Sequence, residues 1–320
     1  MKKILVTGAF GQIGTELTDA LRIRYGNDNV IAAGHKTKPK SKLLDSGPYV
    51  FIDTTKRRTI EAIVKKYDIN KIYHLAAILS ASGEENPQLA WNVNINGLYN
   101  ILEIAMNNKI DQVFYPSSIA VFGPKTSKVK TPQDTILDPK TIYGVTKVAG
   151  EMLCDYYFKS FGLDIRGIRF PGIISSEALP GGGTTDYAVE IFYNAIQKKR
   201  YTCFVRKDTI LPMMYMPDVI NAIISLMETS LPRLKHHSNF NLASMSFSAE
   251  ELAMEIKKHI PEFVCEYQPD HFRQNIADSW PMSIDDTAAR KEWGWRPQFN
   301  LKSMTEDMIK KLTKKLTLVN

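Results

Sequence analysis

Residues 7–14 read Thr7-Gly8-Ala9-Phe10-Gly11-Gln12-Ile13-Gly14 and directly follow the apolar run Ile4-Leu5-Val6. Apolar residues at helical spacing begin near Gln12, so the glycines lie in a turn between a strand and a helix. Glycines in this setting allow a tight turn and let a pyrophosphate approach the unpaired N–H groups at the helix start. A glycine-rich turn without a ligand is the alternative. The residues predicted to contact a dinucleotide here are Gly8, Phe10, Gly11, Gln12, Ile13 and Gly14.

Strands and helices continue to alternate through the first half of the chain. The predicted strands are Lys3–Thr7, Val30–Ala33, Val50–Ile52, Lys71–Leu75, Gln112–Pro116 and Asp164–Phe170. The predicted helices are Gln12–Arg24, Arg57–Tyr67, Pro87–Asn107 and Tyr143–Phe161. This alternation predicts the α/β class, with a Rossmann-type doubly wound parallel sheet.

Beyond Phe170 the pattern loosens. Loops are predicted around Pro171-Gly172, Pro180-Gly181-Gly182-Gly183, Leu211-Pro212 and Trp280-Pro281, and helices near residues 187–198, 218–228 and 249–259. We interpret this part as a smaller substrate-binding lid over the carboxyl edge of the sheet, where ligands of such folds bind. The predicted dinucleotide-binding domain comprises residues 1–170 with about 212–235, and the predicted lid comprises residues 171–211 and 236–320.

The composition limits the kinds of ligand and binding partner that the protein is expected to have. The 320 residues include 41 Lys and Arg against 34 Asp and Glu, for a net charge of +7. The densest basic stretch, Lys36–Lys42, lacks aromatic residues, so we expect a solvated loop and no nucleic-acid partner. Cys154, Cys203 and Cys265 lie far apart, which predicts neither a disulfide framework nor a metal site. The start is too weakly apolar for a signal peptide, and no run reaches the roughly 20 apolar residues of a membrane span. We therefore expect a cytoplasmic protein that does not enter a membrane.

The end of the second predicted strand bears on the choice of cofactor. A carboxylate about 20 positions after the glycine turn would bind the adenosine ribose of NAD. Here the strand is followed by Gly34, His35 and Lys36, without a carboxylate. NADP therefore stays open, because His35 or Lys36 could face a 2′-phosphate. Asp53, after the third predicted strand, is placed to meet the adenine, although an exposed strand-end carboxylate is the alternative.

A phenol and an amine lie four residues apart at Tyr143 and Lys147, on one face of a predicted helix. A nearby cation favours phenolate, so the pKa of Tyr143, ordinarily about 10, is predicted to fall towards the range useful for a general base. Ser117 and Ser118 end a predicted strand upstream and supply a hydroxyl to orient a substrate alcohol. Because side chains alternate along a strand, only one of them is expected to face the site.

With these elements in this order, the chain resembles the short-chain dehydrogenase/reductase superfamily, in the extended branch that includes sugar-nucleotide epimerases. The matching segments are Thr7–Gly14, His74-Leu75-Ala76-Ala77, Asn94-Ile95-Asn96-Gly97, Ser117–Gly123, and Tyr143 with Lys147. The resemblance implies further cofactor contacts at Leu75, Ala76, Ala77, Asn94, Tyr143, Lys147, Pro171 and Ile173. It favours Ser118 over Ser117 as the orienting hydroxyl, although both are retained. It also implies a homodimer, formed through the helices Pro87–Asn107 and Tyr143–Phe161.

Three stretches resemble the L-threonine 3-dehydrogenases of the short-chain type. They are Pro116–Gly123, Leu179–Val189 and Leu211–Asp218. That family oxidises the side-chain hydroxyl of threonine with NAD to give 2-amino-3-ketobutyrate, a step of threonine catabolism. The resemblance implies the same NAD-dependent oxidoreductase activity here.

The predicted substrate site suits a small zwitterion better than a nucleotide sugar. Ile119 and Ala120 stand where sugar-nucleotide dehydratases carry an Asp-Glu pair, and the loop Gly181–Asp186 offers no cation for a diphosphate. Asp186 is expected to face an ammonium, or alternatively to cap the following helix, as Thr185 also could. The residues predicted to bind substrate are Ser80, Ser117, Tyr143, Thr184, Thr185, Asp186 and Trp280. A nucleotide-sugar 4-epimerase and a non-catalytic NAD(P)-binding regulator are the alternative functions.

Overall fold

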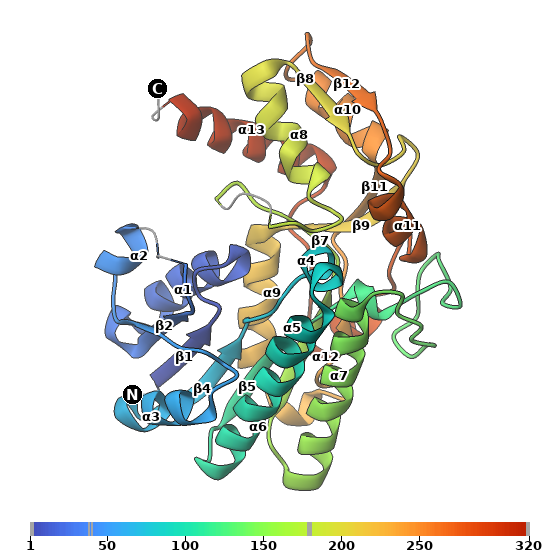
Figure 1. Cartoon of the computed structure of the whole chain (residues 1–320). Helices are drawn as coiled ribbons and strands as arrows, with labels where there is room; N and C mark the ends of the chain where they lie inside the picture. Colours follow the sequence, from blue (N-terminus) through green and yellow to red (C-terminus); the bar gives the residue numbers. More distant parts are fainter. Residues whose placement is uncertain (1–2, 38, 40, 178–180, 318–320) are drawn as a thin grey trace.

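A seven-stranded parallel sheet lies at the centre of the structure, a computed structural model that describes residues 3–37, 39, 41–177 and 181–317 (Figure 1). The strand order is β10-β6-β5-β4-β1-β2-β3, and every neighbouring pair is parallel. The bounds are β1 (Lys3–Thr7), β2 (Val30–Gly34), β3 (Tyr49–Phe51), β4 (Ile69–His74), β5 (Gln112–Ser118), β6 (Ile165–Phe170) and β10 (Phe240–Asn241). The predicted Rossmann-type doubly wound sheet is confirmed.

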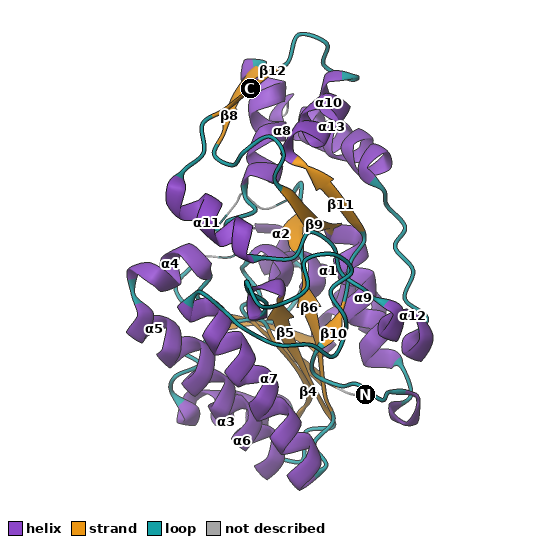
Figure 2. Cartoon of the chain, turned by 90° about the vertical axis from the view of Figure 1, so that its right-hand side faces the viewer, coloured by secondary structure: helices purple, strands orange, loops and turns teal. Residues whose placement is uncertain are grey.

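Helices cover both faces of this sheet, and Figure 2 shows the strands between the two layers. One layer contains α1 (Gln12–Tyr25), α9 (Met216–Glu228) and α12 (Thr287–Trp293), and the other contains α3 (Arg57–Tyr67), α6 (Gly97–Asn107) and α7 (Ile142–Phe161). Ile4 and Val6 of β1 pack into the first layer, while Leu5 packs into the second. A strand buried on both faces needs apolar residues at successive positions, which explains the uninterrupted run Ile4-Leu5-Val6.

The helix predicted over Pro87–Asn107 is found as three consecutive segments. A π-helical turn (Asn92–Asn96) separates α5 (Pro87–Trp91) from α6. The side chain of Asn94 in this turn accepts from the N–H of Ile78 at 2.8 Å and donates to its carbonyl at 3.0 Å. A π-helical turn widens the helix locally, and here it directs Asn94 toward the loop after β4.

The C-terminal part contains more strands than the sequence pattern predicts. β7 (Gly172–Ile174), β9 (Ile210–Tyr215) and β11 (Met245–Ser248) form one sheet in the order β11-β9-β7, and β8 (Arg200–Cys203) pairs with β12 (Val264–Tyr267). These sheets are accompanied by α8 (Tyr187–Lys198), α10 (Ala249–Lys257), α11 (His271–Ser279) and α13 (Leu301–Thr317) (Figure 1). Two further short helices are α2 (Ser41–Asp45) and α4 (Ser80–Glu85), and single 3-10 turns lie at Asn27–Asn29, Ile119–Val121 and Leu231–Arg233.

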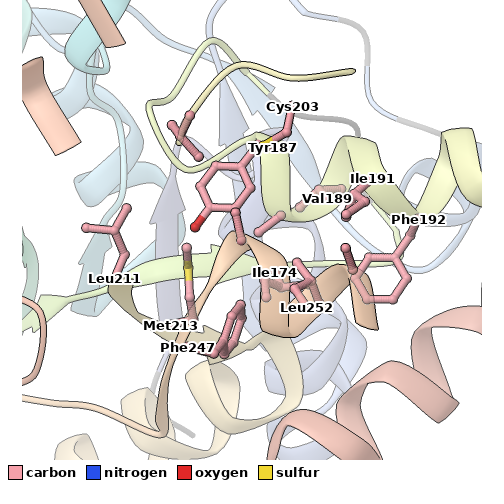
Figure 3. Packing of buried hydrophobic residues seen from close by; sticks show 14 of the residues in the cluster. Ile174, Tyr187, Val189, Ile191, Phe192, Cys203, Leu211, Met213, Phe247 and Leu252 are labelled. Atoms are coloured by element: carbon pink, nitrogen blue, oxygen red, sulfur yellow. The ribbon is translucent and has the colours of Figure 1, made fainter. Parts of the chain in front are cut away.

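The loop predicted at Leu211-Pro212 is wrong, because both residues lie in β9, the middle strand of its sheet. Proline has no N–H to donate and argues against a central strand. Here the buried side chains of Leu211 and Met213 pack beside Tyr187 and Phe247 (Figure 3). Burial of this apolar run outweighs the hydrogen bond that Pro212 cannot make.

The division of the chain into two domains stays a prediction. We propose a boundary that keeps β10 and α12 with the large sheet, although the predicted division placed both in the lid. Phe240 of β10 and Trp293 of α12 belong to the same buried cluster as Ile4 and Val6 of β1. In the described part of the chain, none of the helices is both long and apolar enough to cross a membrane.

Candidate active site

A cavity of about 240 Å³ opens at the carboxyl ends of the strands of the large sheet, beneath the segment after β6 and the loop before α8. It brings together the predicted residues Gly8, Gly11, Gln12, Ile13, Gly14, Leu75, Ala77, Ser80, Ser117, Ser118, Tyr143, Lys147, Pro171, Ile173, Thr184, Thr185, Asp186 and Trp280. The predicted residues Phe10, His35, Lys36, Asp53, Ala76 and Asn94 do not line it. The predicted catalytic side chains and the glycine turn thus share one cavity.

The glycine turn fits a dinucleotide phosphate. Gly8 has a φ of +68°, and a Cβ there would lie 2.7 Å from the backbone nitrogen of Ala76. A Cβ on Gly14 would lie 2.1 Å from the carbonyl oxygen of Gly8, so only glycine lets α1 approach the turn this closely. α1 begins after Gly11 without a side-chain cap and without an acidic residue in its first turn. Its first N–H groups and the positive end of its dipole can therefore bind a phosphate.

Phe10 lies at the end of β2 instead of lining the cavity. A Cβ on Gly34 would lie only 1.9 Å from the Phe10 ring, and this ring also meets Phe51 edge to face, with centroids 5.9 Å apart. A larger residue at position 34 would displace Phe10.

Asp53 follows β3 and is engaged locally. Its carboxylate accepts hydrogen bonds from the backbone N–H of Thr55 at 3.0 Å and from the Thr55 hydroxyl at 2.7 Å. Burial raises the pKa of Asp53, but the hydrogen bonds from Thr55 and the charges of His35 and Lys56 outweigh it, so the pKa lies below its ordinary value. The carboxylate is therefore ionised and partly satisfied within its own turn.

Asn94 and Ala76 do not line the cavity but support the loop after β4, which does. Asn94 is buried, and besides Ile78 its side-chain amide donates to the hydroxyl of Thr146 on α7 at 3.0 Å. The backbone of Ala76 packs against Gly8. Both residues hold the loop after β4 in place, so the side chains of Leu75 and Ala77 reach the cavity.

Tyr143 and Lys147 stand one turn apart near the start of α7, which the hydroxyl of Thr141 caps by accepting from the N–H of Gly144 at 3.0 Å. The Nζ of Lys147 lies 5.4 Å from the centroid of the Tyr143 ring. It donates to the carbonyl oxygen of Pro116 at 2.5 Å. The buried ammonium therefore ties α7 to the end of β5.

The prediction that the pKa of Tyr143 falls is wrong in this structure. Removal from water raises the pKa of Tyr143 to about 12, although a hydrogen bond with Ser118 lowers it. Removal from water also lowers the pKa of Lys147 to about 8, against the charges of Cys154 and Glu151, which raise it. The spacing of Tyr143 and Lys147 was expected to favour phenolate, but desolvation of the phenol is the larger effect here.

The hydroxyls of the two serines at the end of β5 have different partners, although both residues line the cavity. The hydroxyl of Ser118 meets Tyr143. The hydroxyl of Ser117 donates to Glu151 on α7 at 2.5 Å, and Glu151 accepts two hydrogen bonds of 2.8 Å from the guanidinium of Arg169. Sequence reasoning missed Glu151 and Arg169, although Glu151 follows Lys147 by one further helical turn.

The loop before α8 supplies the far wall of the cavity. The hydroxyl of Thr184 is buried and has no hydrogen-bond partner among the described residues. Asp186 accepts from the N–H groups of Gly182 at 2.8 Å and Gly183 at 2.6 Å, and its side chain does not cap α8. Burial raises the pKa of Asp186, although these N–H groups lower it. Asp186 fixes the glycine loop, while Leu179 and Pro180 of the same motif lie outside the described residues.

Six further residues line the cavity that were not predicted to be cofactor or substrate contacts. They are Leu79, Pro116, Ile119, Phe170, Gly172 and Gly183. Pro116, Ile119 and Gly183 lie within stretches already quoted from the sequence, and the other three adjoin a predicted residue in the chain.

Comparison with known proteins gives concordant matches along the chain. Residues 4–243 match the NAD dependent epimerase/dehydratase family. An uncharacterised epimerase/dehydratase of Staphylococcus haemolyticus is 50% identical over 315 residues, covering 98% of this chain and 99% of that protein. The structure of L-threonine dehydrogenase from Clostridium difficile is 52% identical with a TM-score of 0.96, covering 98% of each chain. A monomeric L-threonine 3-dehydrogenase from a metagenome is 52% identical with a TM-score of 0.94, covering 98% and 99%.

Proposed function

This chain belongs to the NAD dependent epimerase/dehydratase family, and from that premise we propose that it is an NAD-dependent L-threonine 3-dehydrogenase. The reaction is oxidation of the threonine side-chain hydroxyl to give 2-amino-3-ketobutyrate. One observation carries the proposal: Ser118, Tyr143 and Lys147 share a cavity with the glycine turn. The similarity to L-threonine dehydrogenases over nearly the whole chain supports the choice of substrate.

The residues that would hold NAD are the glycine turn with the start of α1, the loop at Leu75 and Ala77, and Pro171 with Ile173. NAD, when bound, supplies the acceptor for the hydride that leaves the β-carbon of threonine. Ser118 orients the substrate hydroxyl by hydrogen bonding. After losing its own proton, Tyr143 acts as phenolate, and its oxygen takes the proton of the substrate hydroxyl as general base. Lys147 keeps a positive charge beside the phenol ring and holds the end of β5 through Pro116.

Substrate contacts come from the far wall of the cavity. The buried hydroxyl of Thr184 has no partner within the described chain, and burying an unpaired hydroxyl is costly. We assign it a hydrogen bond to the carboxylate or hydroxyl of threonine, with Ser80, Thr185 and Trp280 completing the wall. Asp186 contributes its negative charge for the ammonium while it holds the glycine loop.

The proposed function is tested by following the absorbance of reduced nicotinamide with NAD and each of three substrates. Threonine should give reduced cofactor, whereas serine should react more slowly and a nucleotide sugar not at all. Epimerised sugar without net reduction of the cofactor would instead establish an epimerase. Cofactor binding with no turnover of any substrate would establish a regulator.

Replacing Ser118 by alanine is expected to lower kcat roughly 100-fold, because the substrate hydroxyl loses the group that orients it. Ser117→Ala is the matched control, since its hydroxyl donates to Glu151. That variant should keep its kcat within about threefold and lose about 1.5 to 3 kcal/mol of unfolding free energy, the range for a hydrogen bond to a charged group. Steady-state kinetics and urea denaturation measure both effects. A lower kcat for Ser117→Ala than for Ser118→Ala would contradict the role of Ser118 in orienting the substrate hydroxyl.

The rate of threonine oxidation is expected to rise with pH between pH 6 and pH 8. The pKa of Tyr143 lies at about 12, so the fraction of phenolate grows about tenfold per pH unit in this range. Above the pKa of Lys147, about 8, loss of the ammonium should weaken the rise. A profile of log kcat/KM against pH measures this. A flat profile from pH 6 to pH 8 would argue against Tyr143 as the base.

We further propose a homodimer formed through α5, α6 and α7. These helices expose large apolar side chains, among them Trp91, Tyr99, Met152 and Tyr156, which are 43 to 65% exposed. Clustered apolar residues on a surface mark an interaction site. Light scattering of the purified protein should give twice the chain mass, and Met152→Glu with Tyr156→Glu should give monomers. A monomeric wild-type protein would refute the proposal. The cytoplasmic location stays a prediction.

A further inference from the structure

We propose that this chain binds NADP as well as NAD, with the 2′-phosphate held by His35 and Lys36 just beyond β2. The inference rests on the proposed function, because it concerns the cofactor of the same site. Three features of the end of β2 support it. The strand end lies beside the glycine turn, packing against Phe10 leaves no room for a carboxylate at position 34, and the basic residues His35 and Lys36 follow.

The end of β2 lies next to the glycine turn. Ala33 pairs with Thr7 of β1, and its carbonyl accepts from the N–H of Ala9 within the turn at 3.0 Å. In dinucleotide-binding folds a carboxylate at this strand end binds the ribose 2′-hydroxyl, or a cation nearby accommodates a 2′-phosphate. The side chains that immediately follow Gly34 are therefore the ones that determine which ribose is accepted.

A carboxylate is excluded from position 34 by packing. A Cβ on Gly34 would lie 1.9 Å from Cδ2 of Phe10 and 2.1 Å from Cε2. The Phe10 ring is itself held edge to face by Phe51. An aspartate at position 34 would therefore require Phe10 to move. Because glycine carries no charge, nothing at position 34 repels a 2′-phosphate.

The carboxylate of Asp53, just after the neighbouring strand β3, is partly satisfied. It accepts two hydrogen bonds from Thr55 and lies 4.0 Å from the ammonium of Lys56. It also interacts electrostatically with His35. Its charge is thus partly balanced within its own turn, which lessens its repulsion of a phosphate.

The two residues that follow Gly34 are basic and exposed. The side chains of His35 and Lys36 are both exposed to solvent, so a phosphate can reach them. The sequence from His35 to Lys42 contains four lysines and no acidic residue. A phosphate monoester carries close to two negative charges at neutral pH and forms charge-assisted hydrogen bonds with such groups. Lys36 and His35 are therefore assigned to the 2′-phosphate.

The test is a binding titration of the full-length protein with NAD and with NADP, without threonine, by isothermal calorimetry. We expect the Kd for NADP to be no more than about tenfold above that for NAD. A larger ratio would overturn the proposal. The Kd for NADP should also rise more steeply with salt than that for NAD, since screening weakens contacts between exposed charges.

Two variants distinguish a specific role of His35 and Lys36 from the general effect of removing positive charge. His35→Ala with Lys36→Ala should raise the Kd for NADP about tenfold and leave that for NAD within about twofold. Lys257→Ala, which removes an exposed lysine from α10, is the control and should change neither value. An unchanged ratio in the double variant would refute the assignment. Loss of NADP binding alone leaves the proposed function standing, whereas a protein that binds neither nucleotide would contradict both.

Discussion

The Tyr143→Phe variant is expected to oxidise threonine about a thousandfold more slowly than the wild-type protein, with its Kd for NAD changed by less than about twofold. The substitution removes only the phenol oxygen, which meets Ser118, and keeps the ring beside Lys147. Water held at the same place is a much weaker base than phenolate, so only a small residual rate should remain. Packing of the ring, and with it the shape of the cavity, should be preserved.

Two measurements make this test decisive. Single-turnover kinetics at saturating threonine report the chemical step, and calorimetric titration reports the cofactor. Ser118→Ala serves as the comparison, because it should retain more activity than Tyr143→Phe if Ser118 only orients the substrate. Turnover within tenfold of wild type in Tyr143→Phe would show that another group takes the proton.

The Glu151→Ala variant is expected to lose about 3 to 5 kcal/mol of unfolding free energy. Glu151 and Arg169 are both buried and joined by two hydrogen bonds of 2.8 Å, and Ser117 donates to the same carboxylate. Removing the carboxylate leaves the guanidinium of Arg169 without its counter-ion in the interior. An uncompensated buried charge costs far more than an exposed pair contributes.

Asp155, one turn further along α7, provides the matched control for this loss of stability. Its ion pair with Lys159 is 2.7 Å long but exposed, with side-chain exposures of 49% and 70%. Asp155→Ala should therefore cost less than about 1 kcal/mol. Urea denaturation of both variants gives the comparison. Equal losses for Glu151→Ala and Asp155→Ala would show that Glu151 does not hold the interior together.

The sequence was most informative where local pattern determines structure. β1 and α3 have the predicted bounds, because continuous apolar runs and helical spacing are properties of neighbouring residues. The strands β7, β8 and β12 of the C-terminal part escaped prediction because they have only three or four residues, too few to show a clear apolar pattern. The proline in β9 added a misleading local signal.

The same distinction applies to the site. The glycine turn and the pair Tyr143 and Lys147 could be read from spacing, and the structure brings them into one cavity. The contact of Phe10 with Gly34 and the link from Ser117 through Glu151 to Arg169 join residues distant in the chain. The raised pKa of Tyr143 depends on how much water surrounds the phenol, which spacing does not reveal.

The buried cluster of the C-terminal part includes residues next to the proposed catalytic groups. Ile119 to Phe122, which follow Ser118, pack in the same cluster as Phe192 and Leu211, and Tyr143 packs against it. A hinge rotation that separated the C-terminal part from the sheet would expose these side chains to water and cost the free energy of their burial. Substrate entry and product release are therefore expected to proceed without the two halves swinging apart.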